Sequence, residues 1–388
     1  MAPLLGDVFG NPSGSHRWAR EERRRLDDAR DQVAEILGAR PGEIVFTSGG
    51  TEADNLAVTG VLGASGGRAV CSAVEHHAVL EPVLASGGAT VAVDAAGRVD
   101  LDALSATLLS HGPPVSLVSV MLANNEVGTV QSIDDVAATV SEATSGAVVH
   151  TDAVAAAPWV DLARHGAAAD LVSVSGHKVG GPKGIGVLVV RDGTALAPLL
   201  RGGGQERERR SGTPDVAGAV GLAAALAATA ADREATGDRV EALRRRLVGG
   251  LLAAVPDAVS VSPPSPLDRT PGTVHLCFPS VDREALLFLL DQAGIGASWG
   301  SSCSSGATEP SHVLAAMGVA GELAGGALRL SLGWCSTAAD VEAALAVVPD
   351  AVARLRSTPP PAPSTTSVTS AVPLVSGDEA STVTGKRS

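Results

Sequence analysis

Two neighbouring lysines, Lys178 and Lys183, follow a run of apolar residues in the segment ADLVSVSGHKVGGPKGIG. The chain has 29 lysines and arginines, and the only other lysine is Lys386, in a polar tail. A lysine amine can lose its proton and form an imine, whereas an arginine guanidinium stays protonated. Lysines that are rare in an arginine-rich chain therefore indicate imine chemistry, with a solvated surface charge as the alternative for both.

Polar residues also follow each of five short apolar runs between residues 43 and 188. These runs alternate with helical patterns, which is typical of a doubly wound, mainly parallel α/β sheet. The carboxyl ends of parallel strands meet at one edge of such a sheet, and ligands bind there. We therefore expect one crevice to collect Thr51, His76, Asn125, Asp152 and Lys178.

Three of these residues also have a purely structural interpretation. Thr51 follows a glycine turn at a helix start, where backbone N–H groups would bind phosphate, yet a helix cap is the alternative. His76 opens the next helix, where a capping or packing role is more common than catalysis. Asn125 belongs to a pair of asparagines, which are frequent turn formers. The convergence of all five strand ends favours a ligand site over these separate roles.

Composition and charge exclude several classes of partner and location. The net charge of -13 argues against nucleic acid or an anionic membrane as the main partner. The basic stretch 17–30 mixes acids with arginines at helical spacing, which predicts a solvated helix face. Four scattered cysteines without a CxxC pair predict a reduced, cytoplasmic protein, and the first residues show no signal-peptide pattern. Residues 216–231 are apolar but shorter than the about 20 residues that span a bilayer, and predict a packed helix.

Two further segments stand out by composition. Residues 201–213 form a glycine turn and a strongly charged loop without helical or strand period, which predicts a functional or mobile loop whose arginines bind carboxylate or phosphate. Cys303 lies among small residues, whereas Cys71 and Cys277 lie in apolar runs typical of buried strands. An exposed, mobile thiol at Cys303 is expected to be reactive.

The same shifts in composition predict three parts of the chain. Residues 1–255 form the large domain, which contains the predicted crevice and whose first residues could pack on the next part. A proline-rich connector leads into a smaller α/β domain, 256–357, which contains the Cys303 segment. Residues 358–388 are rich in Pro, Ser and Thr and poor in bulky apolar residues, so we expect this tail to be disordered.

Seven strings, in this order, resemble the cysteine desulfurases, which belong to the class V aminotransferase group of pyridoxal 5′-phosphate enzymes. They are FTSGGTEADN, EHHAVL, NNEVG, SGHKVGGPKGIG, GGGQERERRSGT, GSSC and LRLSLG. The likeness covers residues 9–347. It implies the fold type I of these transferases, a doubly wound, mainly parallel sheet with a smaller C-terminal α/β domain.

The resemblance implies pyridoxal 5′-phosphate as cofactor and a role for each matching position. Lys178 would bind the cofactor as an imine and later move protons, and Asp152 would keep the pyridine nitrogen protonated. His76 would stack on the ring and assist proton transfer, while Asn125 would hydrogen-bond its phenolic oxygen. The residues implied in phosphate binding are Gly50, Thr51, Ser175, His177 and, from the other subunit of a homodimer, Thr213.

The implied activity is the removal of sulfur from L-cysteine, which leaves alanine. Arg329 would bind the substrate carboxylate through two hydrogen bonds, beside Asn125. A Cys303 thiolate would take the sulfur as a persulfide and pass it to an acceptor protein, for example a scaffold for iron-sulfur cluster assembly. The chain would then be a cytoplasmic, homodimeric transferase without a metal site.

Three positions depart from the family pattern. Family members usually begin with a further segment that carries an Ala-Thr-Thr-Pro element, so we expect either an upstream start or a pocket that lacks one wall. Ala155 stands where the family commonly has a glutamine, and the lost hydrogen bond is worth about 0.5 to 1.5 kcal/mol. Gln205 stands where a histidine is frequent.

Two alternatives remain open at this point. The first is another class V aminotransferase, epimerase or lyase in which Cys303 is incidental. The second is a non-catalytic partner protein that lacks the N-terminal segment and carries Ala155 in the pocket. Substrate screening separates the first from a desulfurase, and the visible colour of a cofactor imine separates both enzymes from the second.

Overall fold

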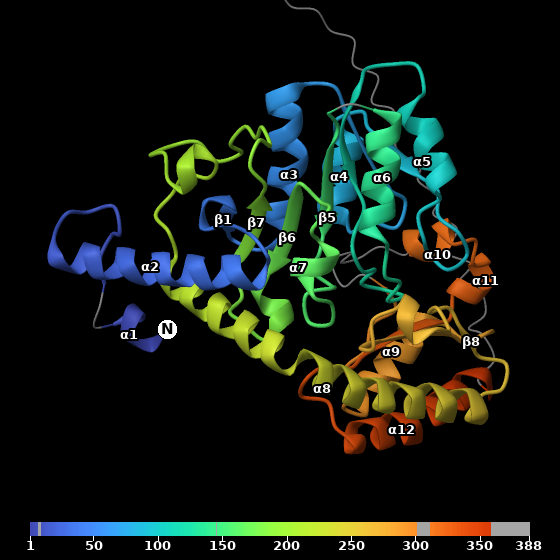
Figure 1. Cartoon of the computed structure of the whole chain (residues 1–388). Helices are drawn as coiled ribbons and strands as arrows, with labels where there is room; N and C mark the ends of the chain where they lie inside the picture. Colours follow the sequence, from blue (N-terminus) through green and yellow to red (C-terminus); the bar gives the residue numbers. More distant parts are fainter. Residues whose placement is uncertain (7–8, 145, 301–310, 358–388) are drawn as a thin grey trace, which may run out of the picture.

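The computed structural model describes residues 1–6, 9–144, 146–300 and 311–357 (Figure 1). Cys303 and the predicted tail therefore lie outside the described residues. The larger of two sheets has seven strands. In spatial order they are β1 (Ile44–Thr47), β7 (Gly186–Val190), β6 (Leu171–Ser175), β5 (Val148–Asp152), β4 (Val115–Ser119), β2 (Arg68–Ser72) and β3 (Ala89–Val91).

This sheet is mainly parallel, as predicted. Only β7 runs against its neighbours, pairing antiparallel with both β1 and β6. Helices cover both faces, as Figure 1 shows. The helices of this part of the chain are α1 (Ala2–Leu5), α2 (Arg17–Ile36), α3 (Gly50–Ser65), α4 (His77–Ala85), α5 (Leu101–Leu108), α6 (Ile133–Ala143), α7 (Leu162–His165) and α8 (Val216–Ala254), with the short 3₁₀ turns η1 (Pro41–Glu43), η2 (Gly176–Val179) and η3 (Glu206–Glu208).

Alternate residues of the central strands divide between two cores. In β6, Leu171 packs in the core under α3 and α4, whereas Val172 and Val174 pack in the core under α2, α6 and α8. Successive side chains of a strand point to opposite faces, so a sheet covered on both sides needs apolar residues at nearly every position. The doubly wound fold predicted from these apolar runs is confirmed.

A second, smaller sheet lies at the other end of the molecule. Its three strands pair antiparallel, with β9 (Thr273–Cys277) between β10 (Ala327–Ser331) and β8 (Val259–Ser260). Its other elements are η4 (Pro266–Asp268), α9 (Arg283–Gln292), α10 (His312–Ala316), α11 (Gly321–Ala324) and α12 (Ala338–Ser357). Cys71 in β2 and Cys277 in β9 are buried, as predicted.

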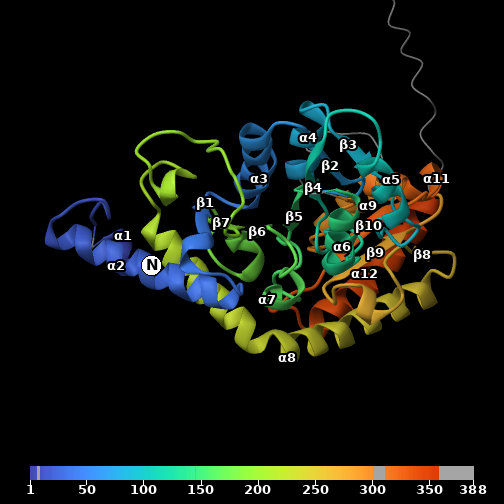
Figure 2. The same ribbon diagram turned by 45° about the horizontal axis from the view of Figure 1, so that its top comes forward.

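Helix α8 connects the two parts (Figure 2). Its first half lies along α2 and contributes Leu222 and Leu226 to the core of the large sheet, and its second half contributes Leu247 and Leu251 to the core beneath α12. Among the described residues, only this helix is long and apolar enough to cross a membrane. The packed helix predicted for 216–231 is confirmed and extends further, while the domain boundary at residue 255 stays a prediction.

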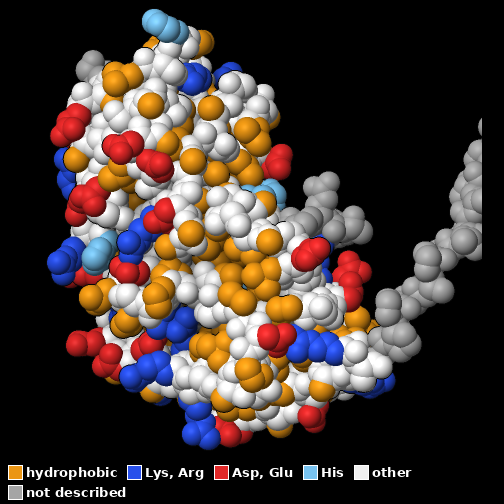
Figure 3. All heavy atoms as spheres, turned by 90° about the vertical axis from the view of Figure 1, so that its right-hand side faces the viewer, with side chains coloured by type: hydrophobic (Ala, Val, Ile, Leu, Met, Phe, Trp, Pro, Cys, Tyr) orange, Lys and Arg blue, Asp and Glu red, His pale blue; other side chains and the backbone are white. Residues whose placement is uncertain are grey.

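Charged side chains of both signs are mixed on the surface. Figure 3 shows one face, where blue and red groups alternate around hydrophobic side chains that gather near its middle. In α2, Arg23 pairs with Asp27, and Arg24 pairs with Glu21. The predicted solvated face is confirmed at these residues, whereas Glu22 and Arg30 of the same stretch are buried. The described part of the face in Figure 3 shows no continuous basic surface of the kind that binds nucleic acid.

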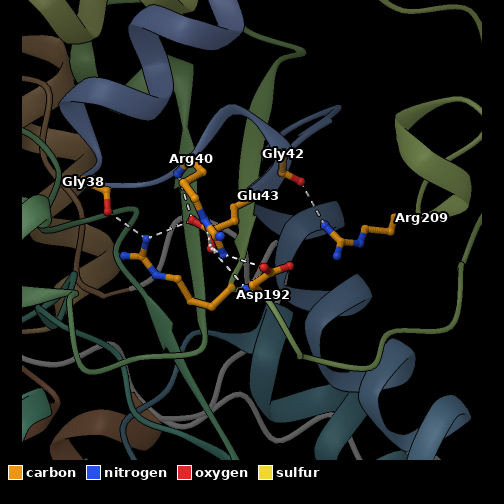
Figure 4. A network of polar contacts seen from close by, with 7 residues as sticks. Gly38, Arg40, Gly42, Glu43, Asp192 and Arg209 are labelled. Carbon is orange, nitrogen blue, oxygen red and sulfur yellow. Dashed lines mark hydrogen bonds and ion pairs between the residues drawn. The ribbon is translucent and has the colours of Figure 1, made fainter.

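A network around Glu43 fixes the start of β1 to the end of β7 (Figure 4). The buried Glu43 carboxylate accepts hydrogen bonds from the backbone N–H groups of Arg40 (2.8 Å) and Asp192 (3.1 Å), and from the Arg40 guanidinium (2.7 Å). Arg209 donates to the carbonyl oxygen of Gly42 at 3.3 Å, which ties the charged loop to the same corner. Burial acts to raise the pKa of Glu43, but these hydrogen bonds outweigh it and lower the pKa to about 2.

We expect the Glu43 network to stabilise the fold above the ordinary glutamate pKa and to lose this effect as pH falls. A pKa that is lowered in the folded state stabilises above the unfolded value of about 4.3, and the stabilisation fades toward pH 2. Glu43→Gln should lower the free energy of unfolding by about 1–3 kcal/mol at pH 7, and by progressively less toward pH 3. Urea unfolding of both proteins at several pH values measures this.

A matched control is Glu35→Gln, which removes an exposed carboxylate from α2. It should leave the free energy of unfolding within about 0.5 kcal/mol of the wild type. A difference between Glu43→Gln and wild type that stays constant from pH 7 to pH 3 would contradict the lowered pKa.

Candidate active site

One cavity of about 310 Å³ lies at the carboxyl ends of the parallel strands. The predicted convergence of Thr51, His76, Asn125, Asp152 and Lys178 is confirmed, because all five line this cavity. Their chemical roles stay predictions. The remaining lining residues are Ser48, Gly49, Gly50, Glu52, Asp54, Met121, Val154, Ala155, Ser175, His177, Gly184 and Arg329.

The amino end of α3 forms one wall of the cavity. Gly49 is its N-cap, has a φ of 149°, and provides no side-chain cap, so the first N–H groups of the helix face the cavity without a capping acceptor. A Cβ at Gly50 would lie 2.7 Å from a Val154 methyl group. Thr51 is exposed and does not cap the helix. Two glycines thus let the backbone approach, as an anion site at a helix start requires.

Ser175 and His177 lie beside this helix end. Ser175 is the last residue of β6, and its hydroxyl lies 2.8 Å from Nδ1 of His177 in η2. Burial and the charge of Lys178 lower the pKa of His177, so the ring is neutral near pH 7. A neutral ring and a hydroxyl can donate hydrogen bonds to an anion without adding charge.

Lys178 is held by the turn η2, directly after β6. The turn ends at Gly180, which has a left-handed backbone with φ of 75° that glycine adopts without strain. Lys178 lines the cavity, whereas Lys183 is exposed in the return turn and does not line it. The structure therefore brings to the cavity the lysine that the sequence favoured.

Asp152 ends β5 and is only 4% exposed. Its Oδ1 accepts a hydrogen bond from Val154 N–H at 2.8 Å. Burial raises the pKa of Asp152 to about 6, although the Val154 N–H and the Lys178 charge act in the opposite direction. The carboxylate is therefore ionised at pH 7.

His76 both caps a helix and faces the cavity. It is the N-cap of α4, where its Nδ1 accepts a hydrogen bond from Ala78 N–H at 3.1 Å, and the ring also lines the cavity. Burial, followed by the charges of His77 and Lys178, lowers the pKa of His76 to about 4. The ring is thus neutral at pH 7 and suited to stacking.

The two neighbouring asparagines, Asn124 and Asn125, have different roles. Asn124 forms the turn, because its Oδ1 accepts hydrogen bonds from Glu126 N–H and Val127 N–H. Asn125 lines the cavity, and its carbonyl oxygen accepts a hydrogen bond of 3.2 Å from Arg329 Nη1. Arg329 lies in β10, so the cavity is closed by both sheets.

Two predicted site residues are not brought together with the others. Thr213 does not line this cavity in the described chain, as expected if it serves another subunit. Cys303 lies outside the described residues. A second cavity of about 640 Å³ adjoins the first and shares Asn125, Ala155, His177 and Lys178 with it, so the Lys178 side of the site opens into a larger hollow.

Sequence reasoning missed Asp54, which lines the cavity from α3 and is only 2% exposed. The signal was available, because Asp54 lies on the buried face of the helix beside Ala53 and Ala57. An acidic side chain is rarely fully buried unless it interacts with another polar group, so an acid on an apolar helix face indicates such an interaction.

These residues fit pyridoxal 5′-phosphate. Its phosphate needs N–H donors at a helix start, its aldehyde needs an amine, and its ring nitrogen needs a carboxylate. The uncapped end of α3, Lys178 and Asp152 supply these three groups in one cavity. No group of His, Cys, Asp and Glu among the described residues could hold a metal ion.

Comparison with known proteins agrees with this chemistry. Residues 1–344 match the family model "Aminotransferase class-V". An "IscS-like cysteine desulfurase" from Mycobacterium tuberculosis is 46% identical over 361 residues, which cover 90% of this chain and 91% of that protein.

Two solved structures are similar in fold and sequence. A "NIFS-LIKE PROTEIN" has a TM-score of 0.83 at 34% identity, covering 91% of this chain and 94% of that one. "SspA in complex with cysteine" has a TM-score of 0.71 at 30% identity, covering 86% and 94%. The chain belongs to the class V aminotransferase family and, within it, to the cysteine desulfurases.

Proposed function

We propose that this chain removes sulfur from L-cysteine, leaves alanine, and passes the sulfur to an acceptor protein through Cys303. The observation that carries the proposal is the placement of Lys178 and Asp152 in one cavity that Arg329 closes from the second sheet. The relatives named cysteine desulfurase and the similar protein solved with cysteine support the substrate.

Bound pyridoxal 5′-phosphate would supply an electron sink for the substrate α-carbon. The Asp152 carboxylate would hold a proton on the ring nitrogen and so keep that sink effective. The Lys178 amine would hold the cofactor before substrate arrives and then carry a proton to or from the substrate carbon. The position of Lys178 directly after the strand end keeps its amine in the cavity with Asp152.

The other residues of the cavity would bind and orient. The amino end of α3, with Thr51, Ser175 and His177, would hold the phosphate, and the neutral ring of His76 would stack on the cofactor and assist proton transfer. Asn125 would hydrogen-bond the cofactor oxygen. Arg329 would bind the substrate carboxylate. Ala155 has no side-chain amide that could hydrogen-bond the cofactor. We expect this to weaken the interaction of the protein with the cofactor by about 0.5 to 1.5 kcal/mol.

Sulfur transfer would occur at the substrate side chain. A Cys303 thiolate would attack the sulfur of cysteine, so that a sulfur-sulfur bond forms as the carbon-sulfur bond breaks. The carbon keeps the electron pair and takes a proton to become alanine, and Cys303 carries the persulfide. A later thiolate of an acceptor, for example an iron-sulfur scaffold, would take the terminal sulfur.

A homodimer would complete the site through Thr213. The charged loop before it is anchored by a buried ion pair, in which Arg30 Nη2 lies 2.6 Å from Glu206 Oε1. Glu206 also accepts a hydrogen bond from Phe46 N–H, and residues 206–208 all have left-handed backbones. An anchored, strained loop of this kind presents a fixed surface, which supports a role at a subunit interface of a cytoplasmic enzyme.

Replacing Cys303 with alanine tests the transfer step. With L-cysteine carrying labelled sulfur, wild-type protein should acquire label on Cys303 and pass it to an acceptor thiol. Cys303→Ala should bind the cofactor with unchanged visible absorption but transfer sulfur only at the rate of a sample without enzyme. Mass spectrometry of the Cys303 peptide and of the acceptor measures both.

Cys335→Ala is the matched control, because Cys335 is the exposed cysteine among the described residues. It should transfer sulfur at the wild-type rate. Unchanged transfer by Cys303→Ala would sink the proposed acceptor role, and would favour an enzyme in which Cys303 is incidental.

A further inference from the structure

A column of buried polar groups lies beneath the cavity, on the face of the sheet that α3 covers. It consists of one residue from each of three neighbouring strands, namely Ser119 of β4, His150 of β5 and Ser173 of β6. Nδ1 of His150 lies 2.8 Å from the Ser119 hydroxyl, and Nε2 of His150 lies 3.0 Å from the Ser173 hydroxyl. All three side chains are fully buried. None of them has a role in the reaction proposed above.

Asp54 reaches into this column from α3. Its Oδ1 is buried, accepts no hydrogen bond, and lies 3.6 Å from Nε2 of His150. Burial and the charge of Asp152 act to raise the pKa of Asp54, and they outweigh the Ser173 hydroxyl, which acts to lower it. An ionised carboxylate with a buried oxygen and no donor would cost far more free energy than a neutral carboxylic acid. The geometry therefore favours the neutral form.

Glu75 is a second buried carboxyl group with an oxygen that has no hydrogen-bond partner. It is 0% exposed, and its Oε1 accepts a hydrogen bond from Met121 N–H at 2.6 Å while its Oε2 is buried without a partner. Three buried carboxyl groups, Asp54, Glu75 and Asp152, thus lie close enough to influence one another.

Little positive charge faces these three groups. Burial lowers the pKa of His150 to about 3, so this ring is neutral, and the nearby Cys71 thiol has its pKa raised by burial and by Glu75. The charge of Lys178 acts on Asp152. Burial, and then the charge of Asp152, raise the pKa of Asp54 and of Glu75 well above their usual range.

We propose that Asp54 is a positioning residue that is held as a neutral carboxylic acid and leaves the single negative charge of the three carboxyl groups on Asp152. Both Asp152 and Glu75 accept a hydrogen bond from a backbone N–H group, but only Asp152 also has the stabilising charge of Lys178 acting on it. If Asp54 were ionised, repulsion in this buried setting would drive a proton onto Asp152. The consequence for the ring nitrogen of the cofactor rests on the proposed function.

Infrared spectroscopy tests the proton on Asp54 directly, because the C=O stretch of a carboxylic acid lies apart from the bands of carboxylates and amides. Wild-type protein at pH 7 should show acid C=O absorption. Asp54→Asn should remove one component and Glu75→Gln another. The matched control is Glu52→Gln on the same helix, whose carboxylate pairs with Arg210 and should leave the acid absorption unchanged.

A second measurement uses the bound cofactor. The acid midpoint of its visible absorption should be the same in Asp54→Asn as in wild type, because no charge is removed beside Asp152. If Asp54 were ionised, removing its charge would lower the pKa of Asp152 and shift the midpoint to lower pH. That shift, or the absence of acid C=O absorption in wild type, would overturn the proposal.

Ser173→Ala covers the case in which Asp54→Asn fails to fold. It keeps every carboxyl group but removes the hydroxyl that acts to lower the pKa of Asp54, so the acid band of Asp54 should shift. An unchanged spectrum would count against the assignment. A colourless wild-type protein would contradict the proposed function. The infrared measurement does not need bound cofactor, so it would still test the protonation of Asp54.

Discussion

Lys178→Ala is expected to abolish the visible absorption of bound pyridoxal 5′-phosphate and to reduce alanine formation from L-cysteine by at least about 10²- to 10⁴-fold, the range for a positioned proton-transfer group. The loss of absorption follows because no other amine among the described cavity residues can form the imine. Absorption spectra of the purified protein and a coupled alanine assay measure the two effects.

Lys183→Ala is the control for this experiment, since it removes the neighbouring lysine of the same glycine-rich segment. Lys183 is exposed and lies outside the cavity, so colour and rate should both match the wild type. Loss of colour in Lys183→Ala, with colour retained in Lys178→Ala, would reverse the assignment of the two lysines.

Asp152→Asn is expected to reduce alanine formation by about 10²- to 10³-fold, as for the loss of one preorganised electrostatic group at a reacting centre. An amide cannot keep the ring nitrogen protonated, so the cofactor would bind but would withdraw electrons poorly. The wild-type rate should also fall as pH drops through about 6, where Asp152 takes a proton, and this acid limb should be absent in the variant. Initial rates between pH 5 and pH 8 measure both.

Asp170→Asn provides a control at the residue directly before the neighbouring strand, β6. The Asp170 carboxylate accepts a hydrogen bond from Val149 N–H, and Asp170 lies outside the cavity. It should lower stability without changing the pH profile. An Asp152→Asn protein that keeps most of its rate would show that this carboxylate does not act on the cofactor ring.

The sequence predicted the site well where chemistry and strand ends coincide. Lys178, Asp152 and Asn125 each follow an apolar run within a few residues, and a parallel sheet brings such positions to one edge. The glycines before Thr51 also indicated an anion site. These features depend on neighbouring residues, so they can be recognised in the amino-acid sequence alone.

Features that depend on long-range contacts could not be predicted in this way. One such feature is the antiparallel direction of β7. This strand pairs antiparallel with β6 and also with β1, which is far away in the sequence. Arg30 lies in a stretch predicted to be solvated, yet it is buried against Glu206, 176 residues away. The acidic residue on an apolar helix face was visible at Asp54, but its proximity to His150 comes from a strand that meets it only in the folded protein.

Product analysis of the wild-type reaction with L-cysteine and a thiol reductant tests the central claim most directly. The account predicts that alanine and released sulfide appear in equal amounts, because the carbon-sulfur bond breaks and the amino group stays on the carbon skeleton. Pyruvate and ammonia in place of alanine would show a lyase built on the same fold and would contradict the proposed desulfurase.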